Sequence, residues 1–315
     1  MTRRLPAWAL FALPLLALAL ALGACRRDPP EQARAPGDPV AAVEGLARAL
    51  RENDLVRYST LSLPPDLHAR SEALWNQRVA AAGPVQDQDQ DAEQYDRLMA
   101  RLTAPEAEAE ILHDLEPKLA RLETEIAGQW PLMQATASIF LNAAIQANAE
   151  LSDAEKAHGA DVVSGLMAWA RPALFTDRDR ARAAVAALVR TAQALQLPTL
   201  GQARALPMIP ALEKGGIALA GVKDLARAYD LDLDRSLDGV SAALVSAEGD
   251  QAQVKVSYPL LDKTVSFEMA MLRRDGGWYS AEAVHQAEAE LTEAAEVAAP
   301  APADAASGAP ADAAG

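Results

Sequence analysis

The stretch GVSAALVSAEGDQAQVKVSYPLLDKTVSFEMAMLRRDGGWYS, residues 239–280, decides the fold class, because the spacing of its apolar residues changes there from helical to alternating. The pattern predicts three strands joined by short turns: Val240–Ala247, Gln251–Tyr258 and Thr264–Leu272. In the third strand every second residue from Val265 to Met271 is apolar, so one face of the sheet should pack on helices. A short strand at Trp278–Tyr279 and an alanine-rich helix over 281–293 follow.

Nearly all of the chain before this stretch has helical spacing. The first helix begins with Asp38 as N-cap and Pro39 at the first helical position, and it should run to about Asn53. Glycines within Gly216–Asp224 should separate the last two of the remaining helices. These are predicted at about 67–82, 90–103, 105–127, 131–150, 152–171, 177–196, 200–213 and 221–230. The expected fold class is α+β, predominantly α-helical, with a small antiparallel meander near the C-terminus.

The N-terminal segment has the layout of an export signal, with Arg3 and Arg4 before a long apolar run. The run ends in Leu22-Gly23-Ala24-Cys25, which resembles the lipobox of bacterial lipoproteins. In that family the cysteine thiol carries diacylglycerol and the signal is cut just before it. The resemblance implies lipidation of Cys25. The alternatives are an ordinary signal peptide, or an uncleaved anchor, with a chance cysteine.

The same resemblance implies a location. In Gram-negative lipoproteins an Asp after the cysteine tends to hold the protein at the inner membrane, and this chain has Arg26 there. We therefore expect an exported, lipid-anchored protein at the outer membrane, facing the periplasm. The predicted organisation is a signal peptide (1–24), a lipidated cysteine with a flexible tether (25–37), a helical region (38–236), the meander with its C-terminal helix (237–293) and a disordered Ala/Pro-rich tail (294–315).

Two segments also resemble NTF2-like and related exported domains. Residues 38–65 are similar to the opening helix of those domains, which ends in an acidic turn before a short Leu/Pro segment. Residues 239–284, which close in RRDGGWYSAEAV, are similar to their final strands. The resemblance implies that the first helix packs with the meander.

The charge of the mature chain limits its partners. Removal of residues 1–24 leaves 27 basic and 44 acidic side chains, a formal charge of −17. Such a body repels phosphate backbones, so no nucleic-acid partner is expected. It gains nothing from an anionic membrane surface either, and the lipid anchor is the expected membrane contact. With a single cysteine, no intrachain disulfide can form.

The chain contains the pattern Glu-x-x-His twice, as Glu110 with His113 and as Glu155 with His158. Helix bundles use this pattern to hold paired metal ions, so these four residues are the metal candidates. The apolar stripe of the 105–127 helix places the first pair toward solvent, whereas Glu155 projects near an apolar face. Because a bundle metal centre needs converging ligands, no metal site and no cofactor are predicted.

A polar stripe on the otherwise apolar 131–150 helix gives the ligand candidates Gln134, Ser138, Asn142 and Gln146. It excludes a membrane span. The stripe is either one wall of a ligand cleft or a strip that faces solvent or a neighbouring helix.

Catalytic motifs are sparse. The chain has no Gly-x-Ser-x-Gly elbow, and none of its histidines lies in a recognisable motif: His68, His113, His158 and His285. The leading hypothesis is an envelope lipoprotein with a non-enzymatic binding or accessory role toward an unknown protein or envelope component. The alternatives are a periplasmic hydrolase with a histidine beside a carboxylate, and a small-ligand carrier with a pocket between sheet and helices near 265–271.

Overall fold

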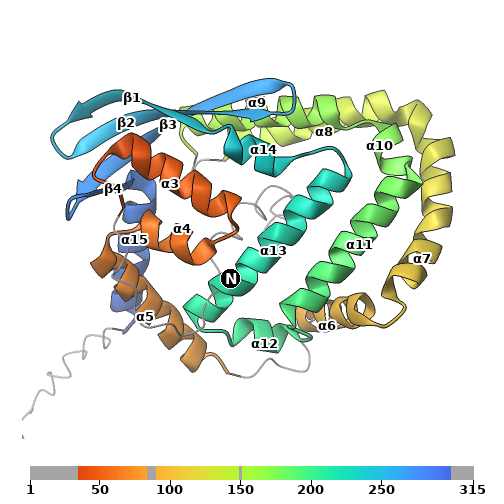
Figure 1. The fold of residues 1–315 in the computed structure, drawn as a ribbon, viewed down its shortest axis with the longest axis horizontal. Helices are drawn as coiled ribbons and strands as arrows, with labels where there is room; N and C mark the ends of the chain where they lie inside the picture. The colour runs from red at the N-terminus through yellow and green to blue at the C-terminus, as the bar shows by residue number, and fades with distance from the viewer. Residues whose placement is uncertain (1–34, 84–89, 149–150, 299–315) are drawn as a thin grey trace, which may run out of the picture.

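The computed structural model describes residues 35–83, 90–148 and 151–298, and its fold is mostly helical with one antiparallel sheet (Figure 1). The α+β class is therefore confirmed. The helices are α3 (Pro39–Arg51), α4 (Leu55–Ser62), α5 (Pro65–Ala81), α6 (Gln90–Thr103), α7 (Ala107–Arg121), α8 (Trp130–Ala147), α9 (Asp153–Trp169), α10 (Pro172–Thr176), α11 (Arg178–Leu195), α12 (Leu200–Arg204), α13 (Met208–Ala228), α14 (Leu233–Asp238) and α15 (Ala281–Ala298). A π-helical turn (Leu122–Ile126) and a 3-10 turn (Ala127–Gln129) join α7 to α8.

The sheet has its strands in chain order, each antiparallel to the next. The strands are β1 (Ser241–Glu248), β2 (Gln251–Leu260), β3 (Lys263–Arg274) and β4 (Gly277–Ser280). The last hairpin turns at Asp275 and Gly276, whose φ angles are 51° and 81°. Two successive positive φ angles match the twist of a tight hairpin, and an Asp-Gly pair supplies them at low cost.

Helix α3 crosses one face of this sheet and supplies its main core (Figure 1). The Asp38 side chain caps α3 by accepting a hydrogen bond from the Ala41 backbone N–H at 2.8 Å, as the sequence predicts. The apolar side of α3 then packs on the alternating residues of the strands. This cluster contains Ala42, Val43, Ala252, Val254, Val256, Met271 and Trp278.

The folded body begins earlier than the predicted tether allows. Ala35 is 4% exposed in a cluster with Tyr279 and Val284, and the Pro36 carbonyl accepts a hydrogen bond from the Trp278 N–H at 3.1 Å. Residues 35–37 are thus part of the body, because their backbone pairs with the start of β4. The remaining tether residues lie outside the described range.

The predicted break within Gly216–Asp224 is wrong, since α13 is one continuous helix. Its glycines serve close packing instead. A Cβ at Gly216 would lie 2.3 Å from the Asn53 carbonyl oxygen, and one at Gly221 would lie 2.1 Å from the Thr191 hydroxyl oxygen on α11. Tertiary contacts here override the low helix propensity of glycine.

Three short helices and the end of α15 also differ from the prediction. The short helices α4, α10 and α14 are not apparent from apolar spacing, because pieces of one or two turns show too little periodicity. Helix α15 continues to Ala298, five residues into the predicted tail. Its alanines are strong helix formers and extend it beyond the part that packs on α5. Residues 299–315 lie outside the described part of the chain.

Candidate functional site

Helix α8 directs the polar side chain of Gln134 toward the protein, although its sequence is mostly apolar. The Gln134 amide donates hydrogen bonds to the carbonyl oxygens of Met167 and, at 3.2 Å, Ala170, which lie at the end of α9. The Trp130 indole N–H donates to the same Ala170 carbonyl at 3.2 Å. Asn142 donates to the Ser138 carbonyl at 2.8 Å. The Asn142 bond lies within α8, whereas those of Gln134 and Trp130 hold α8 against α9, the long helix beside it (Figure 1).

The opposite side of α8 is apolar and uncovered. Leu132, Ile139 and Phe140 are 72%, 69% and 71% exposed, and Met133 is also exposed. No residue of α8 is fully buried, and its sequence from Trp130 to Ala147 contains no Asp, Glu, Lys or Arg. We call these four side chains the outer face of α8. Covering one such side chain completely would stabilise a complex by about 1.5–3 kcal/mol. A row of exposed apolar side chains is therefore typical of an interaction surface.

The sequence candidates on α8 therefore have different positions. Gln134, Ser138 and Asn142 are half-buried on the side toward α9, and Gln146 is exposed. Of the predicted alternatives, the strip that faces a neighbouring helix fits Gln134, whose amide is bonded to α9. The outer face of α8 was not predicted, since an apolar helix in a sequence gives no sign of which side its neighbours leave open.

The second Glu-x-x-His motif lies between α9 and the sheet. His158 Nε2 is 2.8 Å from the Tyr258 hydroxyl oxygen, and its ring centroid is 4.7 Å from that of Phe267. Burial lowers the pKa of His158 and raises the pKa of Tyr258 to about 12. Both groups are therefore neutral at pH 7, and the pair joins α9 to β2.

Glu155 of the same motif is engaged in capping. Its carboxylate accepts a hydrogen bond from the Ser152 N–H at 2.6 Å, and the Glu155 N–H donates to the Ser152 hydroxyl. This is the capping box of α9. The Ser152 hydrogen bonds are the main cause of the lowered pKa of Glu155. Burial, followed by the nearby charge of Glu155, raises the pKa of Glu282, which is hydrogen-bonded to Glu155 from the start of α15.

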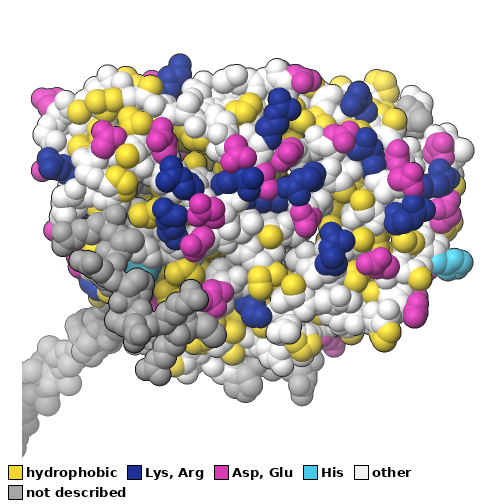
Figure 2. Space-filling model, in the orientation of Figure 1, with side chains coloured by type: hydrophobic (Ala, Val, Ile, Leu, Met, Phe, Trp, Pro, Cys, Tyr) yellow, Lys and Arg dark blue, Asp and Glu magenta, His cyan; other side chains and the backbone are white. Residues whose placement is uncertain are grey.

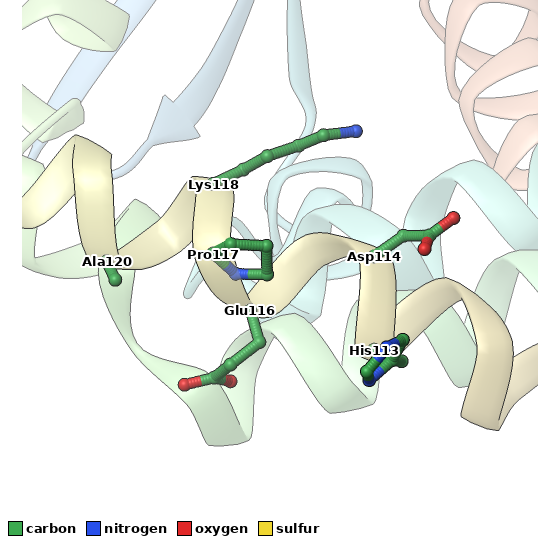
Figure 3. Close-up of a pocket in the computed structure, with 6 residues that line it drawn as sticks. All are labelled: His113, Asp114, Glu116, Pro117, Lys118 and Ala120. Carbon is green, nitrogen blue, oxygen red and sulfur yellow. The ribbon is translucent and has the colours of Figure 1, made fainter.

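The first Glu-x-x-His motif is on the solvent side of α7, where Glu110 and His113 are both exposed. A hollow of about 690 Å³ lies beside His113 and is lined only by α7 residues. Their side chains diverge (Figure 3). Asp114 pairs with Arg101 at 2.6 Å and Glu116 with Arg178 at 2.7 Å, so the hollow has no converging polar groups to offer a ligand.

The structure does not bring the two motifs together into one set of ligands. Within residues 35–83, 90–148 and 151–298, no group of three or more His, Cys, Asp or Glu side chains is placed to hold an ion. The Glu155 carboxylate is hydrogen-bonded in a helix cap, and His158 is hydrogen-bonded to Tyr258. Glu110 and His113 have no carboxylate or imidazole partner across a helix interface in that set.

One histidine lies next to a possible nucleophile. His68 is 8% exposed, and its Nε2 is 3.0 Å from the Ser59 hydroxyl oxygen. Burial lowers the pKa of His68, and Glu72 acts on it only through charge, in the opposite direction. In the part of the chain that the structure describes, no carboxylate is hydrogen-bonded to His68. The contact joins α4 to α5 across the Pro64 turn. His285, the fourth histidine, is exposed on α15.

The buried ammonium of Lys223, which no sequence motif indicates, joins three helices. Lys223 on α13 is 2% exposed and lies 2.8 Å from Asp234 on α14. Arg227 also contacts Asp234, at 2.7 Å, and Arg51 lies 3.6 Å from it. Burial alone would raise the pKa of Asp234, but the Lys223 hydrogen bond and these charges lower it. Acidic and basic side chains alternate over the middle of the viewed face in Figure 2.

The region expected to hold a small-ligand pocket is packed. Val265 and Met271 are each 1% exposed, and Met271 belongs to the core between the sheet and α3. Phe267, between them, stacks on His158. The side chains of this strand face are therefore used for packing.

Comparisons with known proteins add no relative: no family model, no curated protein and no solved structure matches this chain. None of the described helices combines the length and the apolar character needed to cross a bilayer. Cys25 and its lipobox lie outside the described residues. Among the features described above, the outer face of α8 is the surface best suited to binding.

Proposed function

We propose that this chain is a lipid-anchored protein of the bacterial envelope, held at the outer membrane and facing the periplasm. We further propose that its body works by non-enzymatic binding of a protein or envelope component through the outer face of α8. The observation that carries the binding role is the exposure of Leu132, Ile139 and Phe140 on a helix without charged residues. The lipobox ending in Cys25 supports the anchor.

The contacts of the titratable residues favour binding over catalysis. His158 and His68 each link two secondary-structure elements, and Lys223 caps and joins helices. Catalytic groups need access to substrate and a shared cavity. The hollow beside His113 contains neither His68 nor His158.

The anchor is tested by feeding producing cells a fatty acid with an alkyne tag. We expect the wild-type chain to be labelled and membrane-bound, and Cys25→Ala to be unlabelled and released. Arg26→Gln is the matched control, because it leaves the lipobox intact and should keep the label. Undiminished labelling of Cys25→Ala would refute the assignment.

The binding surface is tested by a photo-crosslinking amino acid at position 140 in intact envelopes. The control is position 98 on α6, where Leu98 is 55% exposed in a different part of the fold. We expect an adduct with a lipid or a protein of the envelope from position 140 and none from position 98. Identical adducts from both positions, or none from either, would show that the outer face of α8 has no specific occupant.

A further inference from the structure

The outer face of α8 has a specific requirement for its occupant: it offers apolar contact area and no charge. Its exposed side chains project from one side of an 18-residue helix, whose other side is hydrogen-bonded to α9. We propose that this face rests in the interfacial region of the bilayer that anchors the protein, so that α8 is a second membrane contact beside the lipid. This inference rests on the lipid anchor of the proposed function.

The shape of α8 fits a helix that lies on a membrane. An 18-residue helix is about 27 Å long, and interfacial helices bury their apolar side about 5–10 Å deep. Leu132 near one end and Ile139 and Phe140 near the middle project from the same side, and the exposed Thr136 between them is small and uncharged. The hydrogen bonds of Gln134 keep its polar group away from the lipid.

The short length of chain between the proposed anchor and the described body keeps that body close to the bilayer. The described body begins at Ala35, ten residues after the proposed acylated Cys25. Fully extended, ten residues span up to about 33–36 Å. A globular body of this length has a radius of gyration of about 18 Å. Because this reach exceeds the radius of gyration, the anchor alone does not fix which face lies on the membrane, and the faces that the tether can turn to the bilayer are held there at a high effective concentration.

A second copy of the chain is a poorer occupant. Each mature body carries a formal charge of −17, so two bodies repel one another on approach. A stable dimer interface also buries about 800 Å² on each partner, from 20–30 residues. The outer face of α8 consists of four side chains, far fewer than the residues of such an interface.

The C-terminal segment is also a poor occupant. Residues 299–315 consist mainly of Ala, Pro, Gly and Asp and contain no Leu, Ile, Val, Met or aromatic residue. They bring no large apolar side chain to cover Leu132 or Phe140. The acyl chains of a bilayer supply the apolar environment that would cover these side chains.

The test uses the lipidated protein in vesicles of dioleoylphosphatidylcholine that contain a brominated phosphatidylcholine as quencher. Because an acylated Cys25 has no free thiol, a cysteine introduced at Ile139→Cys can be labelled alone with bimane. Leu98→Cys, also on an exposed apolar position, is the matched control. We expect the bimane at 139 to shift to the blue and to be quenched, and the bimane at 98 to do neither. Phe140→Ser in the Ile139→Cys protein should reduce the quenching.

Other occupants give different results. A blue shift without quenching in these protein-free vesicles would indicate self-association or the C-terminal segment, and would overturn the proposal. An unshifted, unquenched label at 139 that becomes protected only in native envelopes would indicate a protein partner, and would overturn it as well. Bimane labelling of the unsubstituted protein at Cys25 would instead show that the anchor itself is absent, which refutes the proposed function separately.

The lack of charge on α8 supplies a second measurement. Quenching at position 139 should not change when the salt concentration is raised, because no ion pairs hold the outer face of α8 to phosphatidylcholine. In vesicles rich in anionic phosphatidylglycerol, quenching should fall at low salt and recover at high salt, since the acidic body is repelled at low salt and screened at high salt. Stronger quenching on the anionic vesicles at low salt would contradict the inferred contact.

Discussion

The Lys223 ammonium lies 2.8 Å from the Asp234 carboxylate and donates hydrogen bonds to the carbonyl oxygens of Leu50 and Arg51, at 2.6 and 3.1 Å. These carbonyls belong to the last turn of α3, whose final C=O groups have no partner within the helix. A single side chain thus caps α3, neutralises a carboxylate of α14 and joins both to α13. Each group that it contacts would lose a partner if the ammonium were removed.

Lys223→Met should therefore destabilise the fold strongly. The methionine fills similar space but removes one hydrogen bond from each of two carbonyls and leaves Asp234 without its ion pair to the ammonium. Because Asp234 keeps its contact with Arg227, the loss of the buried hydrogen bonds should cost about 1–3 kcal/mol, which urea unfolding at neutral pH would measure. Lys118→Met, on the exposed surface of α7, is the control and should change the free energy of unfolding very little. Equal changes in the free energy of unfolding for the two variants would show that the buried lysine stabilises the fold no more than an exposed one.

The glycines of α13 and α9 give an ordered series. Alanine in a helix interior is favoured over glycine by about 0.5–1 kcal/mol, provided that its Cβ has room. At Gly216 the Cβ would lie 2.3 Å from a backbone oxygen of Asn53, whereas at Gly159 it would lie 3.2 Å from the flexible end of Ile145. Gly216→Ala should lower the melting temperature, and Gly159→Ala should leave it unchanged or raise it. A higher melting temperature for Gly216→Ala would contradict the close approach.

The parts of the fold that could be predicted are those set by local pattern. The meander follows from alternation and turn residues, and the Asp38 cap and the Ser152–Glu155 capping box follow from a few adjacent side chains. The continuity of α13 could not be predicted, because it depends on what Gly216 meets elsewhere in the chain. The outer face of α8 could not be predicted for the same reason. An apolar helix is expected to lie in the core, and the sequence does not show that α8 lies at the side of α9 with one of its faces uncovered.

The buried His68 and the half-buried His158 should make stability depend on pH. Burial lowers the pKa of both His68 and His158 in the folded protein. The unfolded chain, with an ordinary histidine pKa of about 6.5, then binds more protons as the solution is acidified. The stability contributed by the neutral rings is complete above about pH 7 and is lost as the pH falls through 6.5 toward the folded-state values.

His158→Gln and His68→Gln should each reduce this loss, since glutamine keeps a hydrogen-bonding group without a titration. The measurement is the urea midpoint of each variant across about pH 7.5 to 5.5, the range around the unfolded histidine pKa. His113→Gln, exposed on α7, is the control and should follow the wild-type curve. A buried-site variant whose curve also follows the wild type would contradict the assigned direction for that histidine.

Glu282 should have the opposite pH dependence. Its pKa is raised in the folded protein, so its contribution to stability is complete below the unfolded value of about 4.3 and is lost as the pH rises through the folded value. Glu282→Gln keeps an N–H donor for Glu155 at every pH. At neutral pH this variant should melt at a higher temperature than the wild type, and the difference should shrink on acidification to about pH 4, near the ordinary carboxyl pKa. A lower melting temperature at neutral pH would show that the two carboxyls do not oppose one another.

Ser59 and His68 allow a direct test of the hydrolase alternative. A serine nucleophile needs a histidine that a third group orients, whereas His68 has no hydrogen-bonded carboxylate in the described part of the chain. We therefore expect a fluorophosphonate probe to leave Ser59 unlabelled. Ser59→Ala should lower the free energy of unfolding by about 1 kcal/mol, the usual contribution of one hydrogen bond, and should leave envelope crosslinking at position 140 unchanged. Probe labelling of Ser59 that disappears in His68→Gln would instead establish a nucleophilic pair, and with it an enzyme.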